Sequence, residues 1–251
     1  MNFQNKALLL LTATIMPMIS VARSNPQVRI NDYLESLKIW WSKLELMPVD
    51  ILICENSGYD MHVVKDWILS VRAEDRITIL QFNGDKSLVM KLGKGAGEAE
   101  MFDRCINENL ISSYDYVIKC TGRLHVKNAD ELLKQIIQNN DDMAISIRGK
   151  LDFVDTRFFI IKGALFKTYL LNLGQEVDDS RGIYLEHIVL KRAFKAFSDG
   201  HKWGQFSALP RYIGVGGSDG KHHSSLLGAF RYFIKNSIHK LGVKFGIYWY
   251  L

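Results

Sequence analysis

Short apolar segments alternate with segments of helical periodicity along most of this chain. The short runs, each rich in Val, Ile or Leu, are residues 7–14, 49–54, 77–80, 114–120, 143–147 and 158–161. Between them, apolar residues recur at spacings of three and four, most clearly at Ile30, Tyr33, Leu37, Trp40 and Leu44. Strands that alternate with helices in this way predict an α/β fold, with a mostly parallel central sheet covered by helices on both faces.

The first apolar run, residues 7–14, allows two interpretations. Lys6, the run itself and the small residues Ser20 and Ala22 resemble a secretory signal that is cleaved after Ala22. Thr12 and Thr14 interrupt the apolar pattern, however, as they would where a buried strand ends in a polar loop. We favour the strand. Cys54 and Cys120 lie inside apolar runs without metal-like spacing, which indicates reduced core thiols and a reducing compartment.

Parallel sheets bind ligands at the carboxyl ends of their strands, so the polar segments after the first two runs are candidate binding sites. Thr12 and Thr14, followed by Arg29, offer hydroxyls and a cation that could hold a nucleotide phosphate, or else they form a capped turn. The segment 55–58, Glu-Asn-Ser-Gly, could recognise a ribose or base, although such residues also form simple turns.

Two further segments have features of an anion site. Residues 93–98, Gly-Lys-Gly-Ala-Gly-Glu, open a helix, where glycines permit close approach and the helix N-terminus favours an anion. This segment matches neither a P-loop nor a dinucleotide fingerprint, and a mobile glycine loop is the alternative. Lys119 and Arg123 flank a turn after an apolar strand, which indicates either a bound phosphate or an internal salt bridge.

The order of these motifs resembles bacterial glycosyltransferases of surface-polysaccharide assembly (O-antigen or capsule type), which have a GT-A-like nucleotide-binding sandwich. The resemblance spans most of residues 7–220. It implies a nucleotide-sugar donor and a saccharide or lipid-linked acceptor. The residues it implies as donor contacts are Thr12, Thr14, Arg29, Glu55, Asn56, Ser57, Lys94, Gly95, Gly97, Lys119, Thr121, Gly122, Arg123, Asp155, Arg157, Gly217 and Ser218.

Glycosyl transfer with inversion needs a carboxylate that deprotonates the acceptor hydroxyl. Glu186, near the start of a helix, is the first candidate and Asp179 is the second, while His187 is expected to be structural. Many GT-A enzymes hold a divalent cation with an Asp-x-Asp motif after the fourth strand, where this chain has Lys-Cys-Thr-Gly-Arg. We therefore assign no metal ligands and leave a divalent cation open, since Lys94, Lys119 or Arg123 could neutralise the phosphates instead.

The C-terminal part carries a basic amphipathic helix. Arg231, Lys235 and His239 are four residues apart beside an apolar face, and the tail ends in Tyr248, Trp249 and Tyr250. We expect a transferase domain at 1–222 and a helix with an aromatic tail at 223–251. The helix either contacts a membrane surface bearing a lipid-linked acceptor or docks on the domain. These expectations place the protein in the cytoplasm, at the inner face of the membrane.

Two other functions fit parts of the sequence. The net charge of +5 is compatible with a non-catalytic nucleotide- or nucleic-acid-binding module, but aromatics interleaved with cations on strands are lacking, so we expect no nucleic-acid partner. The signal-like N-terminus is compatible with a secreted binding domain.

Overall fold

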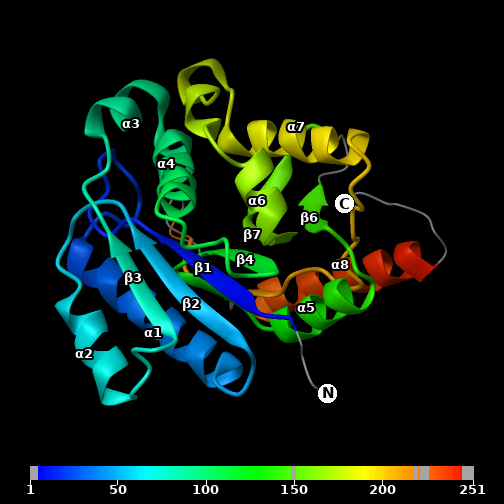
Figure 1. The fold of residues 1–251 in the computed structure, drawn as a ribbon, viewed down its shortest axis with the longest axis horizontal. Helices are drawn as coiled ribbons and strands as arrows, with labels where there is room; N and C mark the ends of the chain where they lie inside the picture. Colours follow the sequence, from blue (N-terminus) through cyan, green and yellow to red (C-terminus); the bar gives the residue numbers. More distant parts are fainter. Residues whose placement is uncertain (1–4, 148–150, 217–219, 221–225, 245–251) are drawn as a thin grey trace.

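The computed structural model describes residues 5–147, 151–216, 220 and 226–244 of the chain. Its centre is a six-stranded sheet with the order β3-β2-β1-β4-β7-β6 (Figure 1). The strands are β1 (Ala7–Ala13), β2 (Val49–Glu55), β3 (Ile77–Gln81), β4 (Tyr116–Thr121), β6 (Met143–Ile147) and β7 (Val154–Lys162). Only β7 runs against the others, pairing antiparallel with both β4 and β6. The predicted α/β fold with a mostly parallel sheet is confirmed.

Helices cover both faces of the sheet (Figure 1). One face packs against α1 (Pro26–Leu44), α2 (His62–Ser70) and α5 (Ala129–Gln138). The other packs against α4 (Lys94–Asn107), α6 (Gly163–Tyr169) and α7 (Leu185–Ser198). Because side chains alternate along a strand, β1 supplies Leu9 and Leu11 to the first core and Leu8 and Leu10 to the second. This double burial explains why residues 7–11 are uniformly apolar.

The sequence of helix α1 explains where this helix begins and which of its faces is buried. The Asn25 side chain accepts hydrogen bonds from the backbone N–H groups of Gln27 and Val28, and Pro26 occupies the first turn, where its missing N–H has no consequence. The buried face includes Ile30, Tyr33, Leu37, Trp40 and Leu44, as the periodicity predicts.

Several smaller elements are not evident from the sequence pattern. These are the helix α3 (Lys86–Leu92), the short helical turns η1 (Leu173–Gln175) and η2 (Asp179–Arg181), and the strand β5 (Leu124–Val126), which pairs with β8 (Tyr212–Gly214) in a small second sheet. Residues 94–98 are the first turns of α4, so the mobile-loop alternative is wrong. Cys54, Cys105 and Cys120 are free and buried, as expected for core thiols.

The last described element is α8 (Leu226–Lys244). Its side chains hydrogen-bond to the segment 206–209, as in the contact from Tyr232 Oη to the Leu209 carbonyl at 3.0 Å. The domain boundary expected after residue 222 falls outside the described residues. Across the described part of the chain, no helix has the length and apolar character needed to cross a bilayer.

Candidate active site

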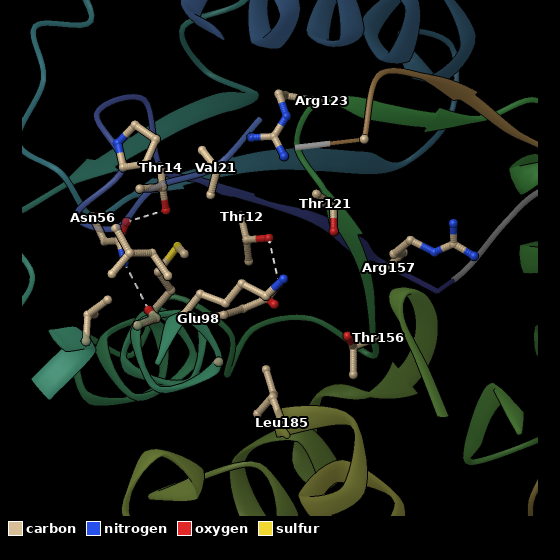
Figure 2. Close-up of a pocket in the computed structure, with 18 of the residues that line it drawn as sticks. Thr12, Thr14, Val21, Asn56, Glu98, Thr121, Arg123, Thr156, Arg157 and Leu185 are labelled. Carbon is tan, nitrogen blue, oxygen red and sulfur yellow. Dashed lines mark hydrogen bonds between the residues drawn. The ribbon is translucent and has the colours of Figure 1, made fainter. Parts of the chain in front are cut away.

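A cavity of about 370 Å³ opens at the carboxyl ends of the central strands. It lies between β1 and β4, where the strand order reverses: α1 connects β1 to β2 over one face of the sheet, and α4 leads from β3 back to β4 over the other. Such a reversal point is the usual ligand site of an open α/β sheet. Figure 2 shows Thr12 and Thr121 at the ends of these two strands, with Arg123 on one side and Glu98 on the other. The volume falls in the range that holds small-molecule ligands.

Many of the residues expected from the sequence line this one cavity. They are Thr12, Thr14, Arg29, Asn56, Lys94, Gly95, Gly97, Thr121, Arg123, Arg157, Asp179 and Glu186. They come from segments more than 170 residues apart in the chain, yet the sheet topology brings them together. That they contact a donor stays a prediction.

Hydrogen bonds connect three of the strand-end and helix segments beneath the cavity. Thr14 Oγ1 donates to Asn56 Oδ1 at 2.6 Å, and Asn56 Nδ2 donates to the Gly97 carbonyl at 3.0 Å (Figure 2). The chain of contacts joins β1, β2 and α4, so this wall of the cavity is held in place before any ligand arrives.

Glu55 and Ser57, expected as donor contacts, do not line the cavity. Glu55 is fully buried, and its Oε1 accepts hydrogen bonds from the backbone N–H groups of Ile15 and Ser57 and from the Ser57 hydroxyl. Ser57 Oγ in turn accepts from the Met16 N–H. The structure therefore shows these two residues bracing the loop after β1.

Lys119 is placed differently from the expected phosphate contact. Its side chain is fully buried within β4, and its Nζ lies 2.6 Å from Glu98 Oε1 and 2.6 Å from the Thr156 carbonyl oxygen. Thr12 Oγ1 also donates to Glu98 Oε1, at 3.0 Å. The internal salt bridge, one of the two alternatives left open by the sequence, is the observed arrangement.

Two buried arginines line the cavity without a carboxylate partner among the described residues. Arg29 donates to the Thr14 and Arg23 carbonyls, and Arg123 donates to Tyr33 Oη at 2.7 Å. Arg29 is 4% exposed and Arg123 is 8% exposed, and the Nε of Arg123 is buried without any hydrogen-bond partner in the described part of the chain. Burial lowers the pKa of Arg29, and the charge of Arg123 lowers it further.

Tyr33 hydrogen-bonds to Thr14 and Arg123 in the part of the cavity that the two arginines line. Its hydroxyl accepts from the Thr14 N–H at 3.0 Å and from Arg123, whose guanidinium lies 5.2 Å from the centre of the Tyr33 ring. Gly122 covers the ring and does not line the cavity: a β-carbon there would be 2.9 Å from both the ring and the Thr12 carbonyl oxygen. Gly122 therefore serves close packing in this structure.

Two glycines of α4, Gly95 and Gly97, also permit close packing, at the wall of the cavity that α4 forms. A β-carbon at Gly95 would be 3.1 Å from Leu185 Cβ, and one at Gly97 would be 2.9 Å from Val89 Cγ2. The first turn of α4 can therefore lie close to the start of α7, and both helix starts border the cavity.

Both candidate carboxylates border the cavity. Burial raises the pKa of Glu186, the charge of Glu98 raises it further, and Lys119 and Lys94 oppose this. Asp179 lies at the N-terminus of α4, where a β-carbon on Gly93 would be only 2.1 Å from its Oδ2. His187 accepts a hydrogen bond from the Tyr184 N–H and caps α7, in agreement with a structural role.

Asp155 does not line the cavity, whereas Arg157 does. Arg157 binds both Asp155 carboxylate oxygens, with its Nη2 2.6 Å from Oδ2, and the Tyr212 hydroxyl donates to the same oxygen. Burial acts to raise the pKa of Asp155, but the hydrogen bonds and charge of Arg157 outweigh it, so the pKa lies below its ordinary value. Asp155 thus positions Arg157 beside the cavity.

The residues at the end of β4 do not fit a divalent cation. Thr121 supplies one hydroxyl there, and Arg123 adds a positive charge. The Glu98 carboxylate already binds Lys119 and Thr12 through its Oε1. Within the described ranges, no group of three or more His, Cys, Asp or Glu side chains is placed to hold a metal ion.

Several cavity residues were missed from the sequence, chiefly Tyr33, Glu98, Thr156 and the loop residues Pro17, Met18, Ile19 and Val21. In the sequence, Tyr33 has the spacing of a core aromatic on a helix, and Glu98, the last residue of the segment 93–98, could equally be a surface acid. Gly217 and Ser218, expected to close over the donor, lie outside the described residues, and Val215 and Gly216 just before them border the cavity.

No protein-family model matches this chain, and no curated protein sequence is significantly similar to it. Some solved structures are similar to it at low identity. A putative nucleotide-diphospho-sugar transferase from Desulfovibrio desulfuricans G20 has a TM-score of 0.49 and 9% identity, with 81% of this chain and 80% of that chain covered. TarS from S. aureus has a TM-score of 0.49 and 10% identity, with 82% and 36% covered. The mannosyltransferase Ktr4p from S. cerevisiae has a TM-score of 0.46 and 10% identity, with 73% and 62% covered. The chain thus spans only part of TarS and Ktr4p.

Proposed function

We propose that this protein is a glycosyltransferase that moves a sugar from a nucleotide-sugar donor to a hydroxyl of a saccharide or lipid-linked acceptor in surface-polysaccharide assembly. The observation that carries the proposal is the pair Arg29 and Arg123, two buried guanidinium groups that line the cavity with no carboxylate partner among the described residues. The order of the sequence motifs around them supports the same assignment.

Two buried like charges are costly unless an anion joins them. Removing a charged group from water costs several kcal/mol, and mutual repulsion adds to this cost. Guanidinium groups bind phosphate oxygens with two parallel hydrogen bonds, so a phosphate group in the cavity would compensate both charges. In this proposal the arginines also stabilise the charge that develops on the leaving phosphate, the task that a metal ion performs elsewhere.

Glu186 supplies the complementary chemistry. In an inverting transfer, its carboxylate takes the proton of the acceptor hydroxyl, the acceptor oxygen bonds to the anomeric carbon, and the bond from that carbon to the phosphate oxygen breaks. The nucleotide leaves with the electron pair, next to Arg123. The raised pKa of Glu186 suits a base that must accept a proton in the transition state.

Thermal shift with uridine, guanosine and cytidine sugar nucleotides tests donor binding, and a radiolabelled transfer assay tests chemistry. We expect one nucleotide class to raise the Tm. Arg123→Leu should weaken its binding about 10- to 100-fold, as expected for lost charged hydrogen bonds. The control Arg104→Leu, an exposed arginine paired with Glu108, should bind normally. Glu186→Gln should bind the donor and lose transfer. If no sugar nucleotide of any class shifts the Tm, the proposal is wrong.

A further inference from the structure

Helix α8 is amphipathic, but the face that it turns toward the protein is polar. Tyr232 Oη donates to the Leu209 carbonyl, Asn236 Oδ1 accepts from the Leu209 N–H at 2.9 Å, and a His239 ring nitrogen lies 2.7 Å from the Phe206 carbonyl oxygen. These three residues follow one another at spacings of four and three, so they form one side of the helix. The helix is therefore attached to the protein by hydrogen bonds from that side.

The opposite side of α8 exposes large apolar side chains. Phe233 is 68% exposed, Leu241 is 57% exposed, Ile234 is 44% exposed and Ile238 is 39% exposed. At about 100° per residue, the four fall within an arc of about 140°. Single apolar residues on a surface are ordinary, but here four gather on one helix face with only Ser237 among them, and such a gathering marks an interaction site.

Basic residues border this patch on both sides. By the same helical geometry, Arg231 and Lys235 lie along one edge of the apolar arc and Lys240 lies along the other, and all three are exposed. The sequence of α8 contains no acidic residue. Arg231 and Lys235 thus lie on the basic stripe expected from the sequence, whereas His239 lies on the side of α8 that hydrogen-bonds to residues 206–209.

We propose that α8 binds the surface of an anionic phospholipid bilayer, with its apolar arc inserted between the acyl chains. An apolar face with cations at its edges is the arrangement of interfacial helices, because long basic side chains reach up to the headgroups while the apolar residues enter to a depth of about 5–10 Å. The charge pattern favours this occupant over a second copy of the chain, since two such faces would bring their cations together. The inference goes beyond the proposed function and does not depend on it.

Vesicle flotation of the full-length protein tests this inference without any sugar nucleotide. The protein should float with phosphatidylcholine vesicles that contain phosphatidylglycerol, far less with pure phosphatidylcholine, and less in high salt. Phe233→Ser and Leu241→Ser should each weaken binding about tenfold. Their controls are Met90→Ser and Leu69→Ser, which are 72% and 57% exposed on other helices and should bind like wild type.

The charge contribution is tested separately. Lys240→Gln and Lys235→Gln should each reduce the partition coefficient about fivefold, the effect of about 1 kcal/mol per basic residue near an anionic surface, while Lys65→Gln on α2 should not. Circular dichroism checks that every variant is folded. No flotation with anionic vesicles would overturn the inference. So would a dimer in light scattering that Phe233→Ser dissociates, because the apolar arc would then be a contact between copies.

Discussion

The ion pair between the buried Lys119 and the partly exposed Glu98 provides the most direct test of the site. The sequence predicts that the Lys119 ammonium binds the donor phosphate, or else that it forms an internal salt bridge, and the structure shows the salt bridge. The two roles predict different effects for the substitution Lys119→Met. A phosphate contact would chiefly affect ligand binding, whereas an internal pair would chiefly affect the free energy of unfolding.

The expected magnitude follows from the exposure of each partner. Breaking a buried ion pair costs about 3–5 kcal/mol, because the remaining charge stays buried and uncompensated. Lys119→Met leaves Glu98, which is 24% exposed and keeps the Thr12 hydroxyl, so we expect a loss near the lower limit, about 3 kcal/mol. Glu98→Gln leaves a fully buried ammonium that keeps only the Thr156 carbonyl and the weaker Thr121 hydroxyl contact, so we expect about 4 kcal/mol.

A double-mutant cycle by urea denaturation at neutral pH measures the coupling. The double variant leaves no buried charge, so it should lose less than either single variant, under about 3 kcal/mol, whereas the sum of the single losses is about 7 kcal/mol. For a chain of this size the Lys119→Met loss corresponds to a fall in Tm of about 6–12 °C. Lys195→Met serves as control, because the Lys195–Asp199 pair is exposed and should contribute under about 1 kcal/mol.

One result would refute this reasoning. If Lys119→Met lowers the unfolding free energy by less than about 1 kcal/mol and weakens nucleotide binding tenfold, the ammonium is a ligand contact and the pair with Glu98 is not structural. Additive losses in the cycle would equally show that the two charges do not interact.

Three further predictions concern the residues around the arginines and the candidate base. Gly122→Ala should destabilise the protein by about 1–3 kcal/mol in urea denaturation, since the new methyl would overlap the Thr12 carbonyl and the Tyr33 ring; a neutral effect would contradict the packing role. Tyr33→Phe should cost about 1–3 kcal/mol by the same assay, because the partly buried Thr14 N–H and a buried Arg123 N–H lose their acceptor, and unchanged stability would show that water replaces the hydroxyl. Glu186 has a raised pKa in the folded state, so its contribution to stability is present below the unfolded pKa and is lost as the pH rises through the folded pKa. The Tm of Glu186→Gln, compared with wild type, should therefore improve as the pH rises from acid to neutral, and a constant difference would mean that the carboxyl is not perturbed.

The sheet and its main helices were predictable because each element has a distinct period. The helical spacing from Ile30 to Leu44 and the apolar strand runs each reflect burial against one core or two. The helix α3, by contrast, is only seven residues long and buries Val89 alone, so its sequence carries almost no periodic pattern. The strand β5 has three residues and is defined by its pairing with β8, which only the tertiary fold brings near.

The position of the cavity was predictable, but the role of each residue in it was not. Carboxyl ends of parallel strands meet at one edge of a sheet, so Thr12, Asn56 and Thr121 could be placed together from the sequence. Which way each side chain points depends on packing. Glu55 turns to the loop after β1, and Lys119 meets an acid from α4, a helix whose closeness to β4 no local pattern records.

The first strand shows why one ambiguity in the sequence has a physical origin. A strand at the centre of a parallel sheet, buried on both faces, is apolar along most of its length, and β1 is buried from Ala7 to Ala13. The apolar core of a secretory signal obeys the same demand for a different reason, so hydropathy alone cannot separate the two. The structure adds what hydropathy lacks: Thr12 and Thr14 interrupt the run where β1 reaches the cavity, bonded to Glu98 and Asn56. A chain cut after Ala22 would lose the strand between β2 and β4 together with these contacts, and could not form this sheet.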